Sequence, residues 1–386
     1  MRIKRSQLGT ALAAIFLLAA FSLWAGDSRP ATAGSMNRYV SPTGSDRNDG
    51  SLAHPWATLN RAAQSAFPGL TIHVAPGVYN EAVVTKQSGA PPARIRFVSE
   101  TKWGAIVRGH ASVTWTNQGD YVDIVGFDIS GDGRGGILNW GSGVRIVANH
   151  VHDIPASNCS GDGGFGIANA NYEGYDNDIV ANVVHNIGDL TRLCARVHGI
   201  YHSNLRGHLD NNISYRNQGF GIHLWHAATD VTIANNLVFS NHYGGILIGA
   251  GDSPHNGDAA FPADHITVAN NIVVHNLNRY GIEEMGVTGN SNRYLNNLVY
   301  QNQNANWRLR TGRQSGTIEA DPQFVNFQPD GRGDYHPRVS SPALRAGFCA
   351  SGPASDIDGK PRPQNTACDI GPYESGPAVT NPWPPD

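Results

Sequence analysis

The side chains best suited to catalysis gather in one short segment near the middle of the chain. The segment reads His198-Gly199-Ile200-Tyr201-His202, and Arg196 and Arg206 flank it. A second segment further along has a similar composition and reads Gly221-Ile222-His223-Leu224-Trp225-His226. Tyrosine, histidine and arginine together are suited to removing a proton that lies next to a carboxylate.

The chemistry that this set could perform is proton abstraction from a uronic acid. An arginine or a protonated histidine neutralises the carboxylate, which makes the C5 proton more acidic. A tyrosinate or a neutral histidine then removes that proton, and a second group protonates the leaving oxygen. Tyr201 is the first candidate for the base or acid, and three histidines could share proton transfer with it. The candidate catalytic residues are Tyr201, His198, His202, His223 and Arg196.

These segments belong to a repeat that runs through the middle of the chain. One half of each repeat carries a Gly-Ile pair, at 136–137, 166–167, 199–200, 221–222, 245–246 and 281–282. The other half carries an asparagine within a short apolar run, at Asn149, Asn182, Asn212, Asn236, Asn271 and Asn297. The asparagines are 33, 30, 24, 35 and 26 residues apart. A repeat of this length, with short strands and turns of variable length, is typical of a parallel β-solenoid.

A solenoid places the candidate residues next to one another. Each coil adds about 4.8 Å of height and stacks like residues, so inward asparagines would form a ladder of mutually bonded amides. The residue after each Gly-Ile pair would face outward, in the column Leu138, Ala168, Tyr201, His223, Leu247 and Glu283. A second outward column would contain Trp140 and Trp225. We therefore expect Tyr201, His223 and Trp225 on one exposed face of neighbouring coils.

Four further residues are candidates for binding a substrate. An exposed indole on a sheet is a platform for a sugar ring, and Arg206 is the alternative to Arg196 for neutralising a carboxylate. The candidates are Trp225, Trp140, His226 and Arg206. Structural roles are the alternative: a loop could pack over Trp225, and His198 could be one ring in an aromatic stack. In a regular strand His202 would face inward, which would require a bulge or a polar core for any functional role.

The two ends of the chain differ from the repeat. We expect the solenoid to span residues 37–320, with a short helix over residues 57–66 covering its open first coil. From residue 321 to residue 386 the chain is irregular and rich in proline and glycine, which predicts a C-terminal cap and tail. Characteristic stretches mark both ends: Tyr39-Val40-Ser41-Pro42-Thr43-Gly44-Ser45-Asp46, Pro76-Gly77-Val78-Tyr79, Asp321-Pro322-Gln323-Phe324 and Asp356-Ile357-Asp358-Gly359-Lys360-Pro361.

These stretches resemble the opening and closing segments of secreted right-handed parallel β-helix proteins of the pectate-lyase superfamily. The resemblance covers nearly all of the chain after its leader and implies an all-β, right-handed parallel β-helix. It is weak for the reaction, because the superfamily contains lyases, hydrolases, epimerases and adhesins. The segment 198–202 also partly resembles the catalytic strand of mannuronan epimerases, Tyr-Gly-Phe-Asp-Pro-His, but it lacks the Asp-Pro-His.

The resemblance leaves several reactions open. Several β-helix lyase families use a lysine base beside Ca²⁺, yet no lysine lies between residues 103 and 359. No strong cluster of Ca²⁺ ligands stands out, so the cofactor is unknown and a Ca²⁺ site stays an open alternative. A glycoside hydrolase needs two carboxylates, for which Glu283 is the first candidate, and no matched partner is evident. We expect a lyase that cleaves a uronic-acid-containing polysaccharide by β-elimination. The alternatives are a glycoside hydrolase, a C5-epimerase and a non-catalytic carbohydrate-binding protein.

The N-terminal leader indicates an exported protein that acts outside the cytoplasm. Residues 1–33 have a basic start and an apolar run, with signal-peptide cleavage expected after Ala25 or Ala33 and no membrane contact afterwards. Only 15% of the 386 residues are charged and the net charge is −3, which argues against nucleic-acid binding. We expect a secreted or periplasmic monomer.

Four cysteines in an exported protein predict two disulfides. Cys159 follows Asn149 by 10 residues and Cys194 follows Asn182 by 12, so both lie in the loop that leaves the same strand on successive coils. The other two cysteines are close together in the tail. We therefore pair Cys159 with Cys194 and Cys349 with Cys368.

Overall fold

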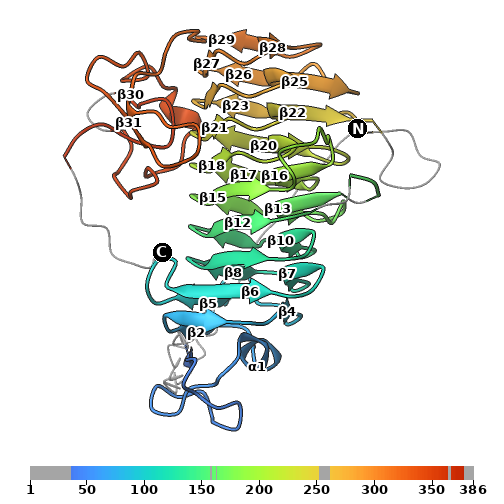
Figure 1. Ribbon diagram of the computed structural model, residues 1–386, viewed down its shortest axis with the longest axis vertical. Helices are drawn as coiled ribbons and strands as arrows, with labels where there is room; N and C mark the ends of the chain where they lie inside the picture. The colour runs from blue at the N-terminus through green and yellow to red at the C-terminus, as the bar shows by residue number, and fades with distance from the viewer. Residues whose placement is uncertain (1–35, 157–158, 162, 252–260, 364–366, 378–386) are drawn as a thin grey trace, which may run out of the picture. The chain divides into compact units, whose positions relative to one another are not determined.

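The computed structural model describes residues 36–156, 159–161, 163–251, 261–363 and 367–377. The predicted leader, residues 1–33, lies outside them. From Met36 to Ser315 the chain forms a right-handed parallel β-helix in which three strands make one coil, as expected (Figure 1). Within the described residues, no helix is long and apolar enough to cross a membrane.

Three parallel sheets form the sides of the coils, and each strand pairs in register with a strand of the next coil. Sheet A consists of β1 (Met36–Val40), β2 (Leu70–Val74), β5 (Ile95–Ser99), β8 (Val122–Val125), β11 (Arg145–Val147), β14 (Asp178–Val180), β17 (Leu205–Asp210), β20 (Thr229–Ala234), β23 (Thr267–Ala269), β26 (Arg293–Leu295) and β29 (Arg313–Ser315). Sheet B consists of β3 (Gly77–Tyr79), β6 (Ala105–Gly109), β9 (Asp128–Gly131), β12 (His150–Ile154), β15 (Val183–Ile187), β18 (Ile213–Tyr215), β21 (Leu237–Phe239), β24 (Ile272–Val274) and β27 (Leu298–Tyr300). Sheet C consists of β4 (Val83–Thr85), β7 (Val113–Asn117), β10 (Gly135–Asn139), β13 (Gly164–Asn169), β16 (Val197–His202), β19 (Phe220–Leu224), β22 (Gly244–Ala250), β25 (Tyr280–Gly286) and β28 (Ala305–Arg308).

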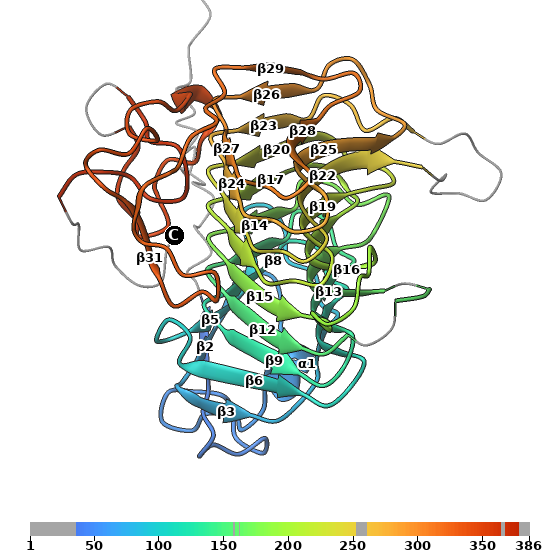
Figure 2. The ribbon, with the colours of Figure 1, turned by 45° about the horizontal axis from the view of Figure 1, so that its top comes forward.

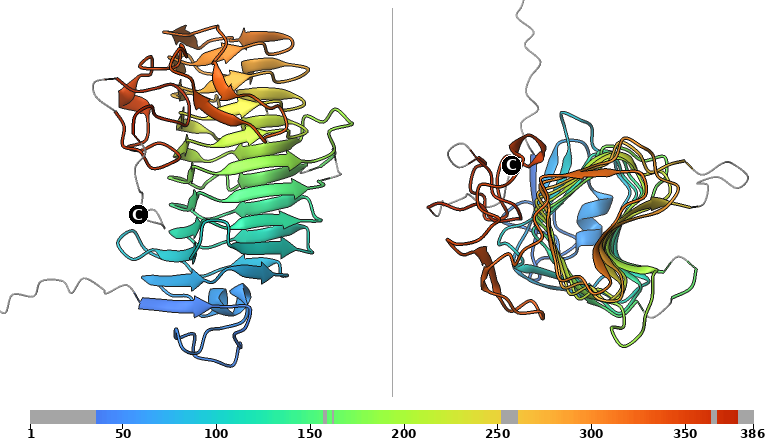
Figure 3. Two further views of the ribbon diagram at one scale, coloured as in Figure 1. Left: turned by 60° about the vertical axis from the view of Figure 1, so that its left-hand side comes forward. Right: turned by 90° about the horizontal axis from the view of Figure 1, so that it is seen from above.

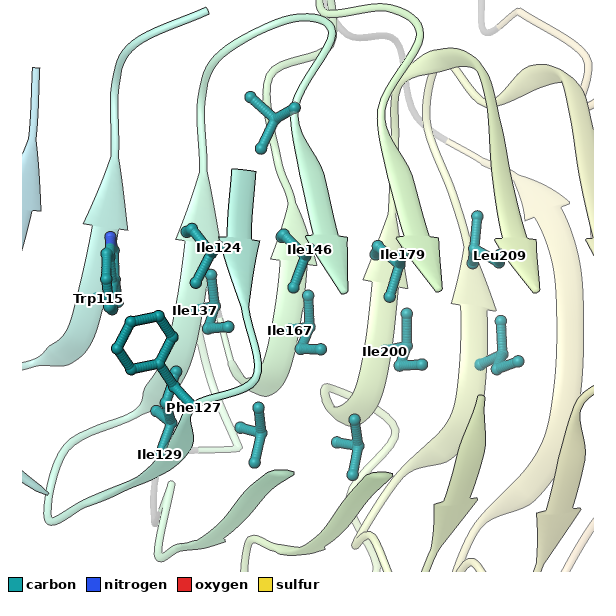
Figure 4. Packing of buried hydrophobic residues seen from close by; sticks show 14 of the residues in the cluster. Trp115, Ile124, Phe127, Ile129, Ile137, Ile146, Ile167, Ile179, Ile200 and Leu209 are labelled. Atoms are coloured by element: carbon teal, nitrogen blue, oxygen red, sulfur yellow. The ribbon is translucent and has the colours of Figure 1, made fainter. Parts of the chain in front are cut away.

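Aliphatic side chains stack from coil to coil to form the core. The isoleucines of the Gly-Ile pairs lie opposite one another in sheet C, as Ile137, Ile167 and Ile200 do, and they are fully buried. A parallel column of isoleucines from sheet A faces them across the interior (Figure 4). Like side chains meet at each level because the register between successive coils does not shift, which confirms the repeat read from the sequence.

The six predicted asparagines form one continuous ladder at the corner between sheets A and B. The Nδ2 group of each donates to the Oδ1 atom of the next at 2.8 to 3.1 Å, from Asn149 through to Asn297. All six are fully buried. The residue before each of them has a positive φ, between 50° and 57°. This left-handed residue turns the chain sharply, and the ladder satisfies the polar groups that the turn buries.

The other two corners carry ladders that the sequence analysis did not predict. At the corner between sheets B and C, four amides are bonded in series at 2.9 to 3.0 Å: Asn217, Asn241, Asn276 and Asn302. At the ends of the sheet C strands a third ladder runs through Thr85, Asn117, Asn139, Asn169 and His202. His202 is therefore the last group of a buried polar ladder, and it faces the interior.

A helix and an irregular tail complete the fold. Helix α1 (Leu59–Gln64) buries Leu59, Ala62 and Ala63 and lies within the outline of the coils when the stack is viewed along its length (Figure 3). It therefore closes the first coil, as expected. The tail contains the short antiparallel pair β30 (Phe324–Asn326) and β31 (Asp334–Pro337) and a 3₁₀ turn at Cys349–Ser351.

The tail lies against the side of the coils nearer the C-terminal end of the stack (Figure 2). Its Phe324, Tyr335 and Ile370 form a second apolar cluster with the outer face of sheet B, including Tyr215 and Phe239. Both predicted disulfides are present. The Cα atoms are 5.7 Å apart in Cys159–Cys194 and 5.4 Å apart in Cys349–Cys368.

The third ladder leads to a prediction about acid stability. Burial lowers the pKa of His202 from 6.5 to about 4. Below about pH 6.5 the unfolded chain therefore binds a proton that the folded chain does not, and stability falls. His202→Asn and His202→Leu both remove this uptake, so between pH 7 and pH 5 we expect each variant to lose about 2 kcal/mol less than the parent protein. Urea unfolding at both pH values measures the difference.

The two variants separate titration from hydrogen bonding. Asparagine still accepts a bond from the Asn169 amide, whereas leucine, which the next coil has at the paired position (Leu224), cannot. At pH 7 we expect His202→Leu to be about 1–3 kcal/mol less stable than His202→Asn. An equal loss on acidification in all three proteins would show that His202 is not held neutral in the core.

Candidate active-site cleft on sheet C

A cleft of about 1090 Å³ opens over the outer face of sheet C. Six neighbouring strands of sheet C, from β10 to β25, contribute to its lining. By the coil spacing of about 4.8 Å, five steps of this stack extend roughly 24 Å. Seven of the ten proposed catalytic and binding residues line the cleft: Trp140, Arg196, His198, Tyr201, His223, Trp225 and His226.

The registered strands bring Tyr201 and His223 side by side. Tyr201 of β16 pairs with His223 of β19, in the column that continues to Glu283 of β25 through Leu247. The Tyr201 and His223 rings meet edge to face, with their centroids 5.5 Å apart. This column contains the residues expected from the repeat.

His198 joins them because the Gly-Ile pair interrupts the alternation of the strand. A Cβ atom on Gly199 would lie 2.4 Å from Ser214 Oγ, and Ser214 is fully buried in the interior. Gly199 and Ile200 thus both face inward, so the residues on either side of the pair, His198 and Tyr201, both face the cleft. Glycine is required at this position because the core leaves no room for a larger residue.

The two cleft histidines are joined by a hydrogen bond. His198 Nε2 and His223 Nδ1 are 2.7 Å apart, and the Phe220 amide donates to His198 Nδ1 at 3.4 Å. We assign the tautomers from this chain of bonds: Nδ1 of His198 accepts, its Nε2–H donates to His223 Nδ1, and the proton of His223 is on Nε2. Nε2 of His223 is buried and has no hydrogen-bond partner among the described residues.

Both imidazoles are neutral near pH 7. Burial lowers the pKa of His198 to about 3. Burial, followed by the proximity of His198 and His226, holds the pKa of His223 well below its usual value. A neutral imidazole with an unused N–H can polarise an oxygen by donating a hydrogen bond to it, as an electrophile rather than as a strong acid.

Aromatic rings and arginines form the walls of the cleft. Trp140 is 45% exposed at one end, and Trp225 lies next to His223 with its ring centroid 5.6 Å away. Tyr172 packs against His226 at 4.3 Å. These rings provide apolar faces of the kind that stack on sugar rings, and Trp225 is half-buried among the described residues.

The Cys159–Cys194 disulfide shapes one wall, as its pairing suggested. It joins the loop before β13 to the loop before β16, and Arg196, in the second loop, donates from Nη1 to the Gly161 carbonyl in the first at 2.8 Å. Arg134 also lines the cleft, with its guanidinium 5.3 Å from the centre of the Phe165 ring. Sequence reasoning missed Arg134, because it lies in a loop before β10 rather than in the repeat.

Three proposed residues lie outside the cleft lining. His202 belongs to the interior ladder. Arg206 follows the turn onto sheet A, where it is half-exposed and forms an ion pair with Asp176 at 2.6 Å. Glu283 has the expected place in the outward column but is fully buried, because Arg279 covers it and bonds both carboxylate oxygens at 2.7 and 2.6 Å.

The donor set of the cleft does not fit a Ca²⁺ site. Ca²⁺ takes six to eight oxygen ligands, mostly from several carboxylates. Among the described residues that line the cleft, Glu173 offers the only carboxylate, since that of Glu283 is bonded to Arg279 beneath the surface. We therefore derive no step of the chemistry through Ca²⁺.

Comparison with known proteins agrees with this architecture. The solved structure of pectate lyase Pel9A has a TM-score of 0.64 at 16% identity, covering 89% of this chain and 98% of that one. A rhamnogalacturonan lyase has a TM-score of 0.55 at 15% identity, covering 79% and 96%. At these identities the likeness shows the fold.

Sequence comparisons add one local match and one that covers most of the chain. The uncharacterized protein YwoF of Bacillus subtilis (strain 168) is 34% identical over 73 residues, so the match spans only 16% of that protein and 19% of this chain. The family model described as "Pel9A-like, right handed beta helix region" matches residues 38–316. The chain therefore belongs to the family of proteins with a Pel9A-like right-handed β-helix region.

Proposed function

We propose that this protein is an extracellular lyase that cleaves a uronic-acid-containing polysaccharide by β-elimination. The observation that carries the proposal is the position of Tyr201 beside the bonded His198–His223 pair, in a long cleft lined by aromatic rings and arginines. The names of two proteins with the same fold, a pectate lyase and a rhamnogalacturonan lyase, support the reaction class.

In this mechanism the arginines prepare the substrate. Arg196 and Arg134 approach the cleft from two loops and neutralise the uronate carboxylate, which makes the C5 proton more acidic. Tyr201, in its ionised form, takes that proton. The electron pair of the broken C5–H bond forms the C4–C5 double bond, the C4–O bond breaks, and the leaving oxygen takes up a proton returned by Tyr201.

The histidines act by position and by hydrogen bonding. The bound substrate would have to displace the side chains that bury Nε2 of His223. Its N–H then stabilises negative charge that develops on the carboxylate or on the leaving oxygen, and His198 holds His223 in the required tautomer. His198 is thus a positioning residue. Trp225, Trp140 and the Tyr172–His226 pair bind sugar rings on either side of the reacting unit. The length of the cleft suits a polymer better than a single sugar.

Hydrolysis fits the described cleft less well. It requires two carboxylates at a defined separation, and Glu283 is buried with both oxygens bonded to Arg279. Epimerisation shares the proton-abstraction step and differs in returning the proton to C5 without breaking the C4–O bond.

An activity screen tests the reaction class. We expect the purified protein to release products with the ultraviolet absorbance of an unsaturated uronide from a pectic, alginate-like or bacterial acidic polysaccharide. A reducing-end assay and an NMR measurement of C5 configuration run on the same samples. New reducing ends without absorbance would show hydrolysis, inversion without cleavage would show epimerisation, and binding alone would show a non-catalytic protein.

Two variants test the assigned base and donor. Tyr201→Phe removes only the hydroxyl and should lower kcat by about 10²–10⁴-fold with little change in KM. His223→Gln keeps a side-chain amide but loses the imidazole and should lower kcat by about 10²–10³-fold. Tyr300→Phe on sheet B and His208→Gln on sheet A serve as matched controls, and both should retain full activity. Full activity in both cleft variants would refute the site.

A third pair of variants tests the sugar platforms. Trp140→Ala and Trp225→Ala remove ring faces from the cleft, and the second also removes the edge-to-face contact with His223. Because stacking contributes to substrate and transition state alike, we expect a higher KM with a smaller change in kcat. Steady-state kinetics on the substrate found in the screen measure both constants, and an unchanged KM in both variants would contradict binding along this cleft.

A further inference from the structure

A cluster of histidines lies on the outer face of sheet B, on a different side of the stack from the cleft. It contains His150 and His152 of β12 and His185 of the next strand, β15, with Asp128 on the preceding strand, β9. The three strands are neighbours on this face (Figure 2). His152 pairs with His185, and His150 pairs with Asp128, so the register of the coils brings all four together.

Each of the three imidazoles has a ring nitrogen close to the other two. One ring nitrogen from each lies within 4.8 Å of the others, and His150 Nε2 is 2.8 Å from His185 Nε2. All three side chains are partly exposed, so an ion in solution can reach them.

A carboxylate orients the first of these ligands. His150 Nδ1 bonds to Asp128 Oδ2 at 2.8 Å. His152 bonds to a carboxylate through each ring nitrogen, Nε2 to Asp128 Oδ1 at 3.1 Å and Nδ1 to Asp153 Oδ2 at 2.9 Å, so it must exchange one of these bonds for a bond to the ion. Because the carboxylate accepts the Nδ1 proton of His150, the lone pair on Nε2 of His150 faces His185. A carboxylate behind a metal-binding histidine is the arrangement that fixes the tautomer in protein zinc sites.

We propose that His150, His152 and His185 bind a divalent first-row transition-metal ion, such as Zn²⁺, with Asp128 orienting His150. Three imidazoles near a carboxylate form a donor set that suits zinc better than calcium or magnesium. In a tetrahedral site with Zn–N bonds of about 2.0–2.1 Å, ligand nitrogens are roughly 3.3 Å apart. The His150 and His185 nitrogens would need to separate by about half an ångström, and the His152 nitrogen, which lies within 4.8 Å of them, would need to reach the same spacing.

The ion would join successive coils next to the docked tail. The His185 ring stacks on Tyr215 of β18 at 4.6 Å, and Tyr215 belongs to the apolar cluster that sheet B forms with the tail. The site is thus a structural one. It strengthens the contact between sheet B and the tail at the edge nearer the N-terminal coils. It involves none of the residues of the cleft and does not depend on the reaction proposed there.

Metal titration of the full chain tests this proposal. After treatment with a chelator and dialysis, we expect one equivalent of Zn²⁺ to bind in calorimetry, and Co²⁺ to give the visible absorption of a tetrahedral nitrogen-ligated ion. Saturation with Zn²⁺ should raise the unfolding midpoint by about 2–4 °C. No saturable binding of either ion would overturn the proposal.

Variants locate the site. His185→Phe keeps the ring stack with Tyr215 while removing a ligand, and His150→Gln removes another; each should abolish the stoichiometric binding. Asp128→Asn should weaken affinity about 10–100-fold. His110→Gln is the matched control, because His110 also pairs with an aspartate, Asp132, at 3.1 Å. It should leave binding intact.

Fold integrity is checked by the unfolding midpoint of each variant without metal. If His150→Gln does not fold, His185→Phe alone decides, since it preserves the stack. Unchanged affinity in His185→Phe, or an equal loss in His110→Gln, would show that the ion binds elsewhere.

Discussion

The buried hydrogen-bond ladders are the constraint on which the rest of this structure depends. At each corner a side-chain amide or hydroxyl must meet its counterpart one coil away, and an amide left unpaired in the interior costs free energy. Register between coils is therefore specified by discrete bonds, such as that from Asn182 to Asn212, in addition to the stacking of isoleucines. A slip of one residue would break bonds at all three corners at once.

The exact register also brings residues that are far apart in the sequence together in one site. Tyr201 and His223 come from different coils, and their contact exists because Ile200 and Ile222 stack beneath them. The glycine of the Gly-Ile pair adds a second requirement. With Gly199 directed inward beside Ser214, the backbone presents both His198 and Tyr201 to the cleft, so a core packing feature determines how many polar groups one strand can offer.

The parts of the structure that could be predicted from the sequence are those that repeat. The sheets, the first asparagine ladder, the outward columns and the Cys159–Cys194 disulfide all followed from equivalent positions on successive coils. The burial of Glu283 could not be predicted in this way. Its column was predicted, but Arg279, which buries it, lies outside the column and has no equivalent in the repeat. Arg134 and Tyr172 were missed for the same reason, because loops of unequal length share no register. Arg206 was placed in the cleft by its nearness in sequence to Tyr201, whereas the turn after β16 carries it onto sheet A.

The coil-by-coil construction also restricts where such a protein can lengthen during evolution. A coil duplicated between β16 and β19 would separate Tyr201 from His223 by an additional 4.8 Å or so and break the bond between His198 and His223. A coil added before β10 or after β25 would leave those contacts as they are and change only how much of a polymer lies along the sheet. Gain and loss of whole coils would thus be tolerated near the two ends of the stack and selected against at its centre, so that the span of substrate bound could diversify while the reacting groups stay in place.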